Sequence, residues 1–116
     1  MRDWIATLDS NELLHRVREE VDVRDCPEII AENYKQATLF EHVEGYDVPL
    51  VANAMSSRKM MALALDTEES KILSEYASRI SKPIPPSFNN SKGAGCQEEI
   101  IASKESDVDL TTLPVL

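Results

Sequence analysis

The sequence is poor in aromatic residues and glycine, and it has no long apolar run. Aromatic residues make up 5% of the 116 residues, so the chain has little with which to stack nucleic acid bases or sugars. No apolar stretch approaches the roughly 18 residues that a membrane-spanning helix needs. The residues after Met1 contain no apolar core of a signal peptide. These absences predict a soluble, cytoplasmic protein without a membrane span.

Cysteine and histidine are also scarce. The two cysteines, Cys26 and Cys96, belong to no Cys-x-x-Cys motif, and neither His15 nor His42 is spaced to complete a zinc site with them. Two free thiols in a reducing compartment are therefore the prediction.

Charge of one sign dominates what is present. The chain carries 21 acidic and 12 basic residues, for a net charge of −9. Binding to a phosphate backbone or an anionic lipid surface requires clustered Lys and Arg, so this balance argues against nucleic acid and membrane partners. An acidic surface does not attract a carboxylate either, and a site for an acidic substrate is expected elsewhere.

The hydrophobic pattern predicts an α+β domain with a small mixed or antiparallel sheet flanked by helices. The expected order is α-β-α-β-β-α-α-β. Helices are expected over residues 2–10, 26–36, 57–65 and 66–81, strands over residues 13–23, 37–43, 48–52 and 98–102, and a helical turn over residues 109–114. Gly45 suits the turn of a hairpin between the second and third strands, and Pro49 indicates that one side of the third strand lacks a partner.

Two capping boxes are expected at helix starts: Asp25 with Glu28, and Asp66 with Glu69. Pro27 suits the first turn of the earlier helix. Apolar faces are expected to turn towards the core in both helices, and they consist of Ile29, Ile30 and Tyr34 in the first and Ile72, Tyr76 and Ile80 in the second. The proline-rich stretch 82–86 is expected to end the last of these helices.

The residues that could carry chemistry form no recognisable active site. His15 and His42 lie in expected strands, and Glu41 should point away from its neighbour His42. Solvated charge is the interpretation of the acidic pairs Glu19-Glu20, Glu68-Glu69 and Glu98-Glu99. A flexible joint is the interpretation of Gly93-Ala94-Gly95, Ser56-Ser57 lacks a nucleophile motif, and Met55, Met60 and Met61 are expected in or beside a core. From the residues alone we predict no catalytic, cofactor-binding or metal-binding residue.

Four stretches, taken in order, carry a family resemblance. They are Asn11-Glu12-Leu13-Leu14 with Glu20-Val21-Asp22; Thr38-Leu39-Phe40-Glu41-His42-Val43-Glu44-Gly45-Tyr46-Asp47-Val48-Pro49-Leu50; Ser57-Arg58 with Ala62-Leu63-Ala64-Leu65; and Gly95-Cys96-Gln97-Glu98-Glu99-Ile100-Ile101 with Asp107-Val108-Asp109-Leu110-Thr111-Thr112-Leu113-Pro114. Together they resemble the amino-terminal region of the UbiD-family decarboxylases. The resemblance covers nearly the whole chain.

The resemblance implies a flavoprotein lyase. UbiD-like enzymes are reversible, non-oxidative decarboxylases of aromatic, heteroaromatic or α,β-unsaturated acids, and they use prenylated FMN together with a divalent metal (Mn or Mg) and K⁺. The modified flavin serves as the electron sink, so the difficult chemistry belongs to the cofactor. The family's catalytic and metal-binding residues lie in a middle domain, and no position of this chain matches them. The full-length enzyme is expected to be a homo-oligomer.

The resemblance also implies a division of the chain and leaves alternatives open. Residues 1–88 are expected to form the N-terminal domain, and residues 89–116 a linker and strand leading into a flavin-binding domain. The chain is then the N-terminal segment of a decarboxylase, inactive alone. The alternative is a stand-alone, non-catalytic subunit of a multi-subunit decarboxylase. An unrelated binding module would have to produce all four stretches by chance.

Overall fold

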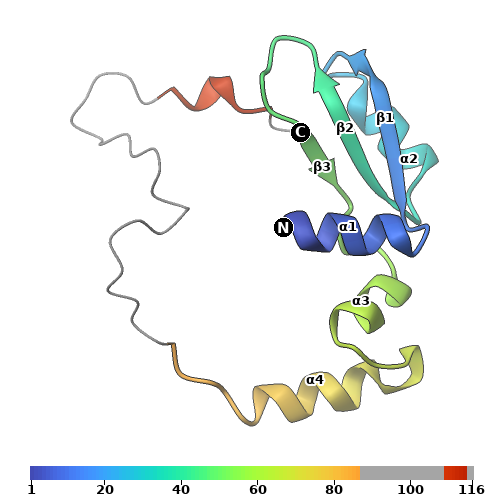
Figure 1. Cartoon of the computed structure of the whole chain (residues 1–116), viewed down its shortest axis with the longest axis vertical. Helices are drawn as coiled ribbons and strands as arrows, with labels where there is room; N and C mark the ends of the chain where they lie inside the picture. Colours follow the sequence, from blue (N-terminus) through green and yellow to red (C-terminus); the bar gives the residue numbers. More distant parts are fainter. Residues whose placement is uncertain (87–108, 115–116) are drawn as a thin grey trace.

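A computed structural model describes residues 1–86 and 109–114 of the chain (Figure 1). Its elements are, in order, α1 (Arg2–Ser10), β1 (Leu14–Val21), α2 (Cys26–Glu32), β2 (Ala37–Val43), β3 (Leu50–Ala52), α3 (Arg58–Ala64), the 3-10 turn η1 (Glu69–Lys71), α4 (Ile72–Ile80) and the 3-10 turn η3 (Leu110–Thr112). The predicted order is confirmed through α4, as is the helical turn near Leu110. The strand expected over residues 98–102 lies outside the described residues.

The three strands form one mixed sheet in the order β1-β2-β3. β1 pairs in parallel with β2, with Leu14 opposite Ala37, and β2 pairs antiparallel with β3, with Leu39 opposite Val51. A parallel pair needs a crossover connection, and α2 supplies it. The predicted α+β class with a small mixed sheet is therefore confirmed.

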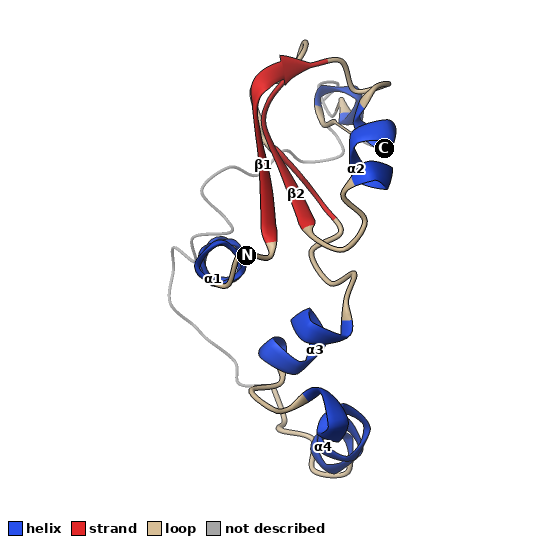
Figure 2. Cartoon of the chain, turned by 90° about the vertical axis from the view of Figure 1, so that its right-hand side faces the viewer, coloured by secondary structure: helices blue, strands red, loops and turns tan. Residues whose placement is uncertain are grey.

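The central strand β2 is covered on both sides. α1 and α2 lie on opposite sides of the sheet (Figure 2). One apolar cluster joins α1, β2 and α3 through the buried residues Leu8, Leu13, Ala37 and Met60, and a second joins the sheet to α2 through Val17, Cys26, Phe40 and Val43. Because successive side chains of a strand point to opposite faces, one strand can serve both clusters.

α2 begins without a capping box, because the backbone of its N-cap residue is already helical. Asp25 occupies the N-cap position and Pro27 the first turn, as predicted, but the Asp25 side chain accepts no capping hydrogen bond. Its backbone is already helical, with φ −91° and ψ −17°, whereas a capping side chain requires an extended N-cap. The capping-box prediction for Asp25 and Glu28 was therefore wrong. Cys26, buried here, donates its thiol to the Asp22 carbonyl.

The end of α2 also differs from the expectation. The helix stops at Glu32, and Tyr34 lies beyond it with 61% of its surface exposed. Ile29 and Ile30 pack against the second cluster as predicted, but Tyr34 does not face the core. A helical face continues only as far as the helix itself, so the earlier stop at Glu32 removes Tyr34 from the buried stripe.

The hairpin between β2 and β3 matches the prediction. Gly45 has φ +81°, a conformation that favours glycine because a β carbon would crowd the backbone. β3 is shorter than expected and begins at Leu50, directly after Pro49. β3 lies at the edge of the sheet, where the missing N–H of proline leaves no ladder bond unmade.

α1 and α3 both end in a Schellman motif with an acidic residue in the left-handed region. After α1, Glu12 has φ +58°, Leu13 N–H donates to the Leu8 carbonyl at 2.8 Å, and Glu12 N–H donates to the Asp9 carbonyl at 3.1 Å. Leu13 and Leu8 also meet in the first cluster, the apolar contact that usually accompanies this motif. The motif therefore turns the chain from α1 into β1.

After α3 the same motif is built around Asp66, with φ +50°. Thr67 N–H donates to the Ala62 carbonyl and Asp66 N–H to the Leu63 carbonyl. Asp66 therefore ends α3 and opens no helix, so the capping box predicted for Asp66 and Glu69 was wrong. α4 instead begins at Ile72, after η1, with no side-chain cap. The true cap in this region is Ser57, whose hydroxyl accepts the Met60 N–H at 3.2 Å.

Most of the apolar face of α4 is exposed and does not pack against the core. Ile72 is buried, but Tyr76 and Ile80 are 57% and 60% exposed, so the predicted core stripe was wrong for these two residues. In Figures 1 and 2, α3 and α4 extend beyond the end of the sheet, which leaves the outer side of α4 without a neighbour among the described elements. The predicted stop before Pro83 is confirmed. No helix of the described residues has the length and apolarity to cross a bilayer.

Replacing Glu12 by glycine is expected to raise the free energy of unfolding by about 1 kcal/mol. The change removes the β carbon that makes the left-handed conformation costly, and it removes a carboxylate from the negative end of the α1 dipole. Urea unfolding measures the effect. Glu12→Ala is the control, because it removes the charge and keeps the β carbon, and its gain should be smaller. A Glu12→Gly protein less stable than the wild type would contradict the assignment.

Replacing Thr38 by valine is expected to stabilise the protein by about 1 kcal/mol. The Thr38 hydroxyl is fully buried in β2 and has no hydrogen-bond partner among the described residues, so it loses water on folding and gains nothing in return. Thermal unfolding compares it with Thr7→Val, which should not stabilise because the Thr7 hydroxyl donates to the Asp3 carbonyl at 2.8 Å. Equal responses of the two variants would show that the Thr38 hydroxyl is satisfied.

Candidate functional site

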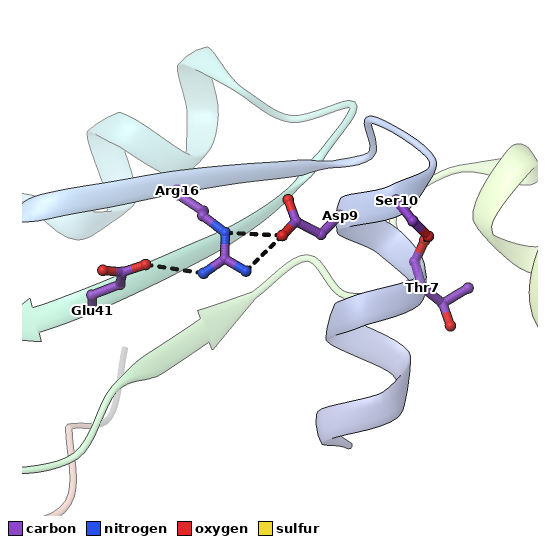
Figure 3. A network of polar contacts seen from close by, with 5 residues as sticks. All are labelled: Thr7, Asp9, Ser10, Arg16 and Glu41. Carbon is purple, nitrogen blue, oxygen red and sulfur yellow. Dashed lines mark hydrogen bonds and ion pairs between the residues drawn. The ribbon is translucent and has the colours of Figure 1, made fainter.

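A group of polar contacts that joins three elements surrounds Arg16 (Figure 3). Its guanidinium, projecting from β1, donates to Asp9 of α1 at 2.7 Å and to Glu41 of β2 at 3.0 Å. All three side chains remain between one third and one half exposed. Arg16 of β1 thus connects α1 with β2 at the surface.

The electrostatics of this group favour the ionised forms. The hydrogen bond from Arg16 lowers the pKa of Asp9, and the two carboxylates raise the pKa of Arg16. The raised pKa keeps the Arg16 guanidinium charged, and the lowered pKa of Asp9 means that this carboxylate is not a proton donor near neutral pH. The arrangement therefore suits the connection of elements and not acid–base catalysis.

A second pair, Asp22 with Arg24, lies at the junction of β1 and α2. The Arg24 guanidinium and backbone N–H both donate to the Asp22 carboxylate, and the side-chain hydrogen bond is the main cause that lowers the pKa of Asp22 to about 2. Burial raises the pKa of the neighbouring Cys26 thiol, which therefore stays protonated and unreactive. This junction shapes a turn and supplies no nucleophile.

The histidines and the glutamate beside them are placed as the strand pattern predicted. His15 is half-buried in β1, and His42 is exposed in β2. Glu41 reaches Arg16, on the face of β2 opposite to that of its neighbour His42. The register of the sheet places His42 opposite Glu20, but within residues 1–86 and 109–114 neither histidine forms a hydrogen bond or ion pair with a carboxylate.

The other sequence candidates are spread over separate elements. Glu19 and Glu20 are exposed on β1, Glu68 pairs with Lys71 at 3.1 Å, and Ser57 caps α3. Glu98-Glu99, Gly93-Ala94-Gly95 and Cys96 lie outside the described residues. Within residues 1–86 and 109–114, no three His, Cys, Asp or Glu side chains are grouped so as to hold a metal ion. The described residues therefore do not fit a divalent metal.

An apolar hollow of about 370 Å³ lies between α3 and α4. We call it the α3–α4 hollow, and it is lined by Met55, Met61, Ala64, Leu65, Ile72, Leu73 and Tyr76. Leu73 is 77% exposed, Tyr76 57%, and the two methionines 47% and 41%. Exposed apolar surface of this kind marks an interaction site more often than a catalytic one.

Sequence reasoning named several residues of the α3–α4 hollow, assigned Tyr76 wrongly and did not single out Leu73. Tyr76 was predicted to face the core because its spacing from Ile72 and Ile80 is helical, and the methionines were predicted to be core or its edge. Met60 is buried and Met61 lines the hollow. The Arg16 group was missed altogether. A signal was available in the sequence. Arg16 directly precedes the apolar Val17 and Glu41 directly follows the apolar Phe40, so both charged side chains are expected on the faces of their strands opposite to these apolar residues.

Replacing Arg16 by glutamine is expected to raise the pKa of Asp9 towards that of an isolated aspartate, because the main hydrogen bond to the carboxylate is lost. A carboxyl with a lowered folded-state pKa contributes stability above its unfolded-state pKa, and this is lost as the pH falls through the folded value. The wild type should therefore lose more stability on acidification than Arg16→Gln. NMR titration and unfolding at several acidic pH values measure both effects.

Arg18→Gln is the matched control for this pair of measurements. Arg18 acts on Asp9 only through its charge, so the pKa of Asp9 should move less than in Arg16→Gln. Equal shifts in the two variants would refute the Arg16 hydrogen bonds as the cause.

Three comparisons place this geometry among known proteins. Residues 5–80 match the 3-octaprenyl-4-hydroxybenzoate carboxy-lyase N-terminal domain, UbiD_N. An uncharacterised protein of Archaeoglobus fulgidus is 30% identical over an alignment of 107 residues that covers 88% of this chain and 22% of that protein. The chain is also similar to solved UbiD-class enzymes.

One is an evolved dimeric form of the UbiD-class enzyme HmfF from Pelotomaculum thermopropionicum in complex with prFMN, with 31% identity and a TM-score of 0.68 over 72% of this chain and 20% of that one. Another is the vanillic acid decarboxylase of Sedimentibacter hydroxybenzoicus in open form, with 29% identity and a TM-score of 0.62 over 73% of this chain and 20% of that one. The chain thus spans about a fifth of the length of these relatives. Since the family match takes in most of α1 and every described element from β1 through α4, the chain belongs to the UbiD N-terminal domain family.

Proposed function

We propose that this chain is the N-terminal domain of a UbiD-like, non-oxidative carboxy-lyase. The enzyme acts on aromatic, heteroaromatic or α,β-unsaturated carboxylic acids with prenylated FMN. The observation that carries the proposal is the similarity of the sheet and helices to about a fifth of UbiD-class enzymes, one of them in complex with prFMN. A domain of this size can contribute to the structure of a larger enzyme without supplying catalytic residues.

The chain contributes to the folding and assembly of the enzyme, and the reaction takes place in another domain. Arg16 and Arg24 engage the carboxylates of Asp9, Glu41 and Asp22, and the described residues do not fit a metal ion. The flavin, the divalent metal and K⁺ are accordingly assigned to the flavin-binding domain, either in the same polypeptide or in a separate subunit. No reaction step is assigned to any residue of this chain.

The proposal divides the chain into residues 1–88, the domain, and residues 89–116, the connection to the flavin-binding part. The family match over residues 5–80 supports the first part of this division, because it ends where α4 ends. The described turn η3 begins after Asp109, whose side chain caps it by accepting the Thr111 N–H at 2.9 Å. Homo-oligomerisation of the whole enzyme belongs to the same proposal.

The test is to purify the protein from its native source and measure its intact mass, flavin absorbance and CO₂ release. We expect a polypeptide about four times heavier than 13.0 kDa, because 72–88% of this chain matches 20–22% of the relatives' length. We also expect bound flavin and decarboxylation of at least one acid from a panel of aromatic, heteroaromatic and α,β-unsaturated compounds. The 116-residue chain alone should release no CO₂.

Two results would contradict this proposal. Turnover by the purified 116-residue chain would show that the chemistry lies within it. A native protein without flavin would remove the cofactor on which the assigned reaction depends. A native chain of 13.0 kDa that copurifies with a flavin-bearing polypeptide would instead support the separate-subunit form of the enzyme.

A further inference from the structure

We propose that the α3–α4 hollow seats an amphipathic helix from the rest of the decarboxylase, and that this helix holds α4 in its folded position. The inference rests on the proposed function, because it takes its partner from the same enzyme. It adds the docking surface, the chemistry of the partner and the residues that make the contact.

The α3–α4 hollow has the size and lining for inserted apolar side chains. Its volume is about 370 Å³ and all of its lining residues are apolar or aromatic. An apolar cavity of about 150 Å³ is large enough for benzene. The hollow therefore has room for two large side chains, the number that a helix presents at positions i and i+3 or i+4.

The exposed residues of α4 follow the spacing of a helix-packing face. Leu73, Tyr76 and Ile80 are three and four residues apart, so they line one side of α4, and each is more than half exposed. This spacing is the one by which one helix packs along another. A second helix laid along α4 would cover the three residues and place its own side chains in the hollow.

α4 needs such a partner to be stable. It has nine residues, and Ile72 is the one that is buried among the described residues. Helices of fewer than about 12 residues are marginal in water unless they pack against other structure. The contacts among residues 1–86 and 109–114 therefore give α4 little support, and burial of Leu73, Tyr76 and Ile80 by another element would stabilise it.

The two walls of the hollow are already joined to each other. The Arg79 side chain donates to the Leu65 carbonyl at 2.6 Å, and the Arg58 side chain donates to the Glu69 carbonyl at 2.9 Å. These bonds run from α4 to the end of α3 and from α3 to η1. When α4 is folded, these bonds fix its position relative to α3 and η1 and so set the width of the α3–α4 hollow.

The charged residues beside the α3–α4 hollow favour a partner with an apolar contact face. Glu75 pairs with Arg79 at 2.8 Å, and Glu68 pairs with Lys71 at 3.1 Å. Each of these groups is therefore compensated within the chain and offers little to a charged ligand. The contact face of the partner should accordingly be apolar, with its polar side turned to solvent.

The remainder of the enzyme fits this role better than a second copy of the chain. The chain spans about a fifth of its solved relatives, so the other four-fifths are available at high effective concentration. A second copy of the chain would meet the hollow only at the concentration of the free protein, which is far below the effective concentration of a helix in the same enzyme.

Hydrogen exchange of the native enzyme tests the inference, with mass spectrometry reading peptides that cover α4. In the wild type, α4 should be protected. Leu73→Lys should accelerate exchange of α4 on the order of 100-fold, because a charge cannot enter the apolar contact. At least one helical peptide outside residues 1–116 should accelerate with it, and that peptide is the seated helix. Ser78→Lys, on the opposite side of α4, is the matched control and should leave exchange unchanged.

Three outcomes would overturn the inference: unprotected α4 in the wild type, equal effects of the two variants, or no responding peptide outside residues 1–116. Protection that disappears when the enzyme is diluted to protomers would show that a second copy occupies the hollow, which also overturns it. Flavin content and CO₂ release are measured on the same samples. An active flavoenzyme with unprotected α4 would refute this inference alone, whereas a protein without flavin would refute the proposed function.

Discussion

Burial of β2 on both faces is the constraint on which the rest of the fold depends. Ala37 belongs to the cluster with α1 and α3, and Phe40 and Val43 to the cluster with α2. Because β1 runs parallel to β2, the chain must cross the sheet between them, and α2 makes that crossing on one face. α1 is then left to cover the other face. The hairpin to β3 completes the sheet without adding a further layer.

The parts of the fold that follow from local chemistry could be predicted from the sequence. The β2 range was predicted to the residue, and Gly45 marked the turn of the hairpin that follows it. The two predicted capping boxes are wrong because aspartate also occurs in other places at helix ends. Asp25 is an N-cap residue with a helical backbone, and Asp66 ends α3 in the left-handed conformation. Which role an acidic residue takes depends on the backbone around it, and the left-handed conformation of Asp66 cannot be read from its neighbours.

The candidate site was harder to predict, for a different physical reason. Helical spacing shows that Ile72, Tyr76 and Ile80 share a face that is stable only when covered, but it carries no information on what covers it. The sequence assigned that face to the core of this chain, and the structure leaves most of it exposed. The Arg16 group posed the opposite difficulty, because it brings together charged residues from three elements whose registers become known only in the folded sheet.

The structure also divides into parts of unequal internal support. The sheet with α1 and α2 contains most of the buried residues, whereas α4 contributes Ile72 and otherwise faces outward. Local opening is easiest where buried contacts are fewest, so α4 should be the least persistent helix when the domain is alone. Such an unequal distribution is suited to a domain that completes its folding during assembly.

One contact at the junction of these parts has a practical consequence. The indole N–H of Trp4, on α1, donates to the Ala54 carbonyl at 2.9 Å, in the segment that leads from β3 to α3. Trp4 is the only tryptophan in the chain and lies half-buried at that junction. The emission spectrum of an indole changes with the polarity of its surroundings and with its hydrogen bonding. The protein therefore contains an intrinsic fluorophore that reports, without labelling, whether α1 and the start of the helical extension remain in contact.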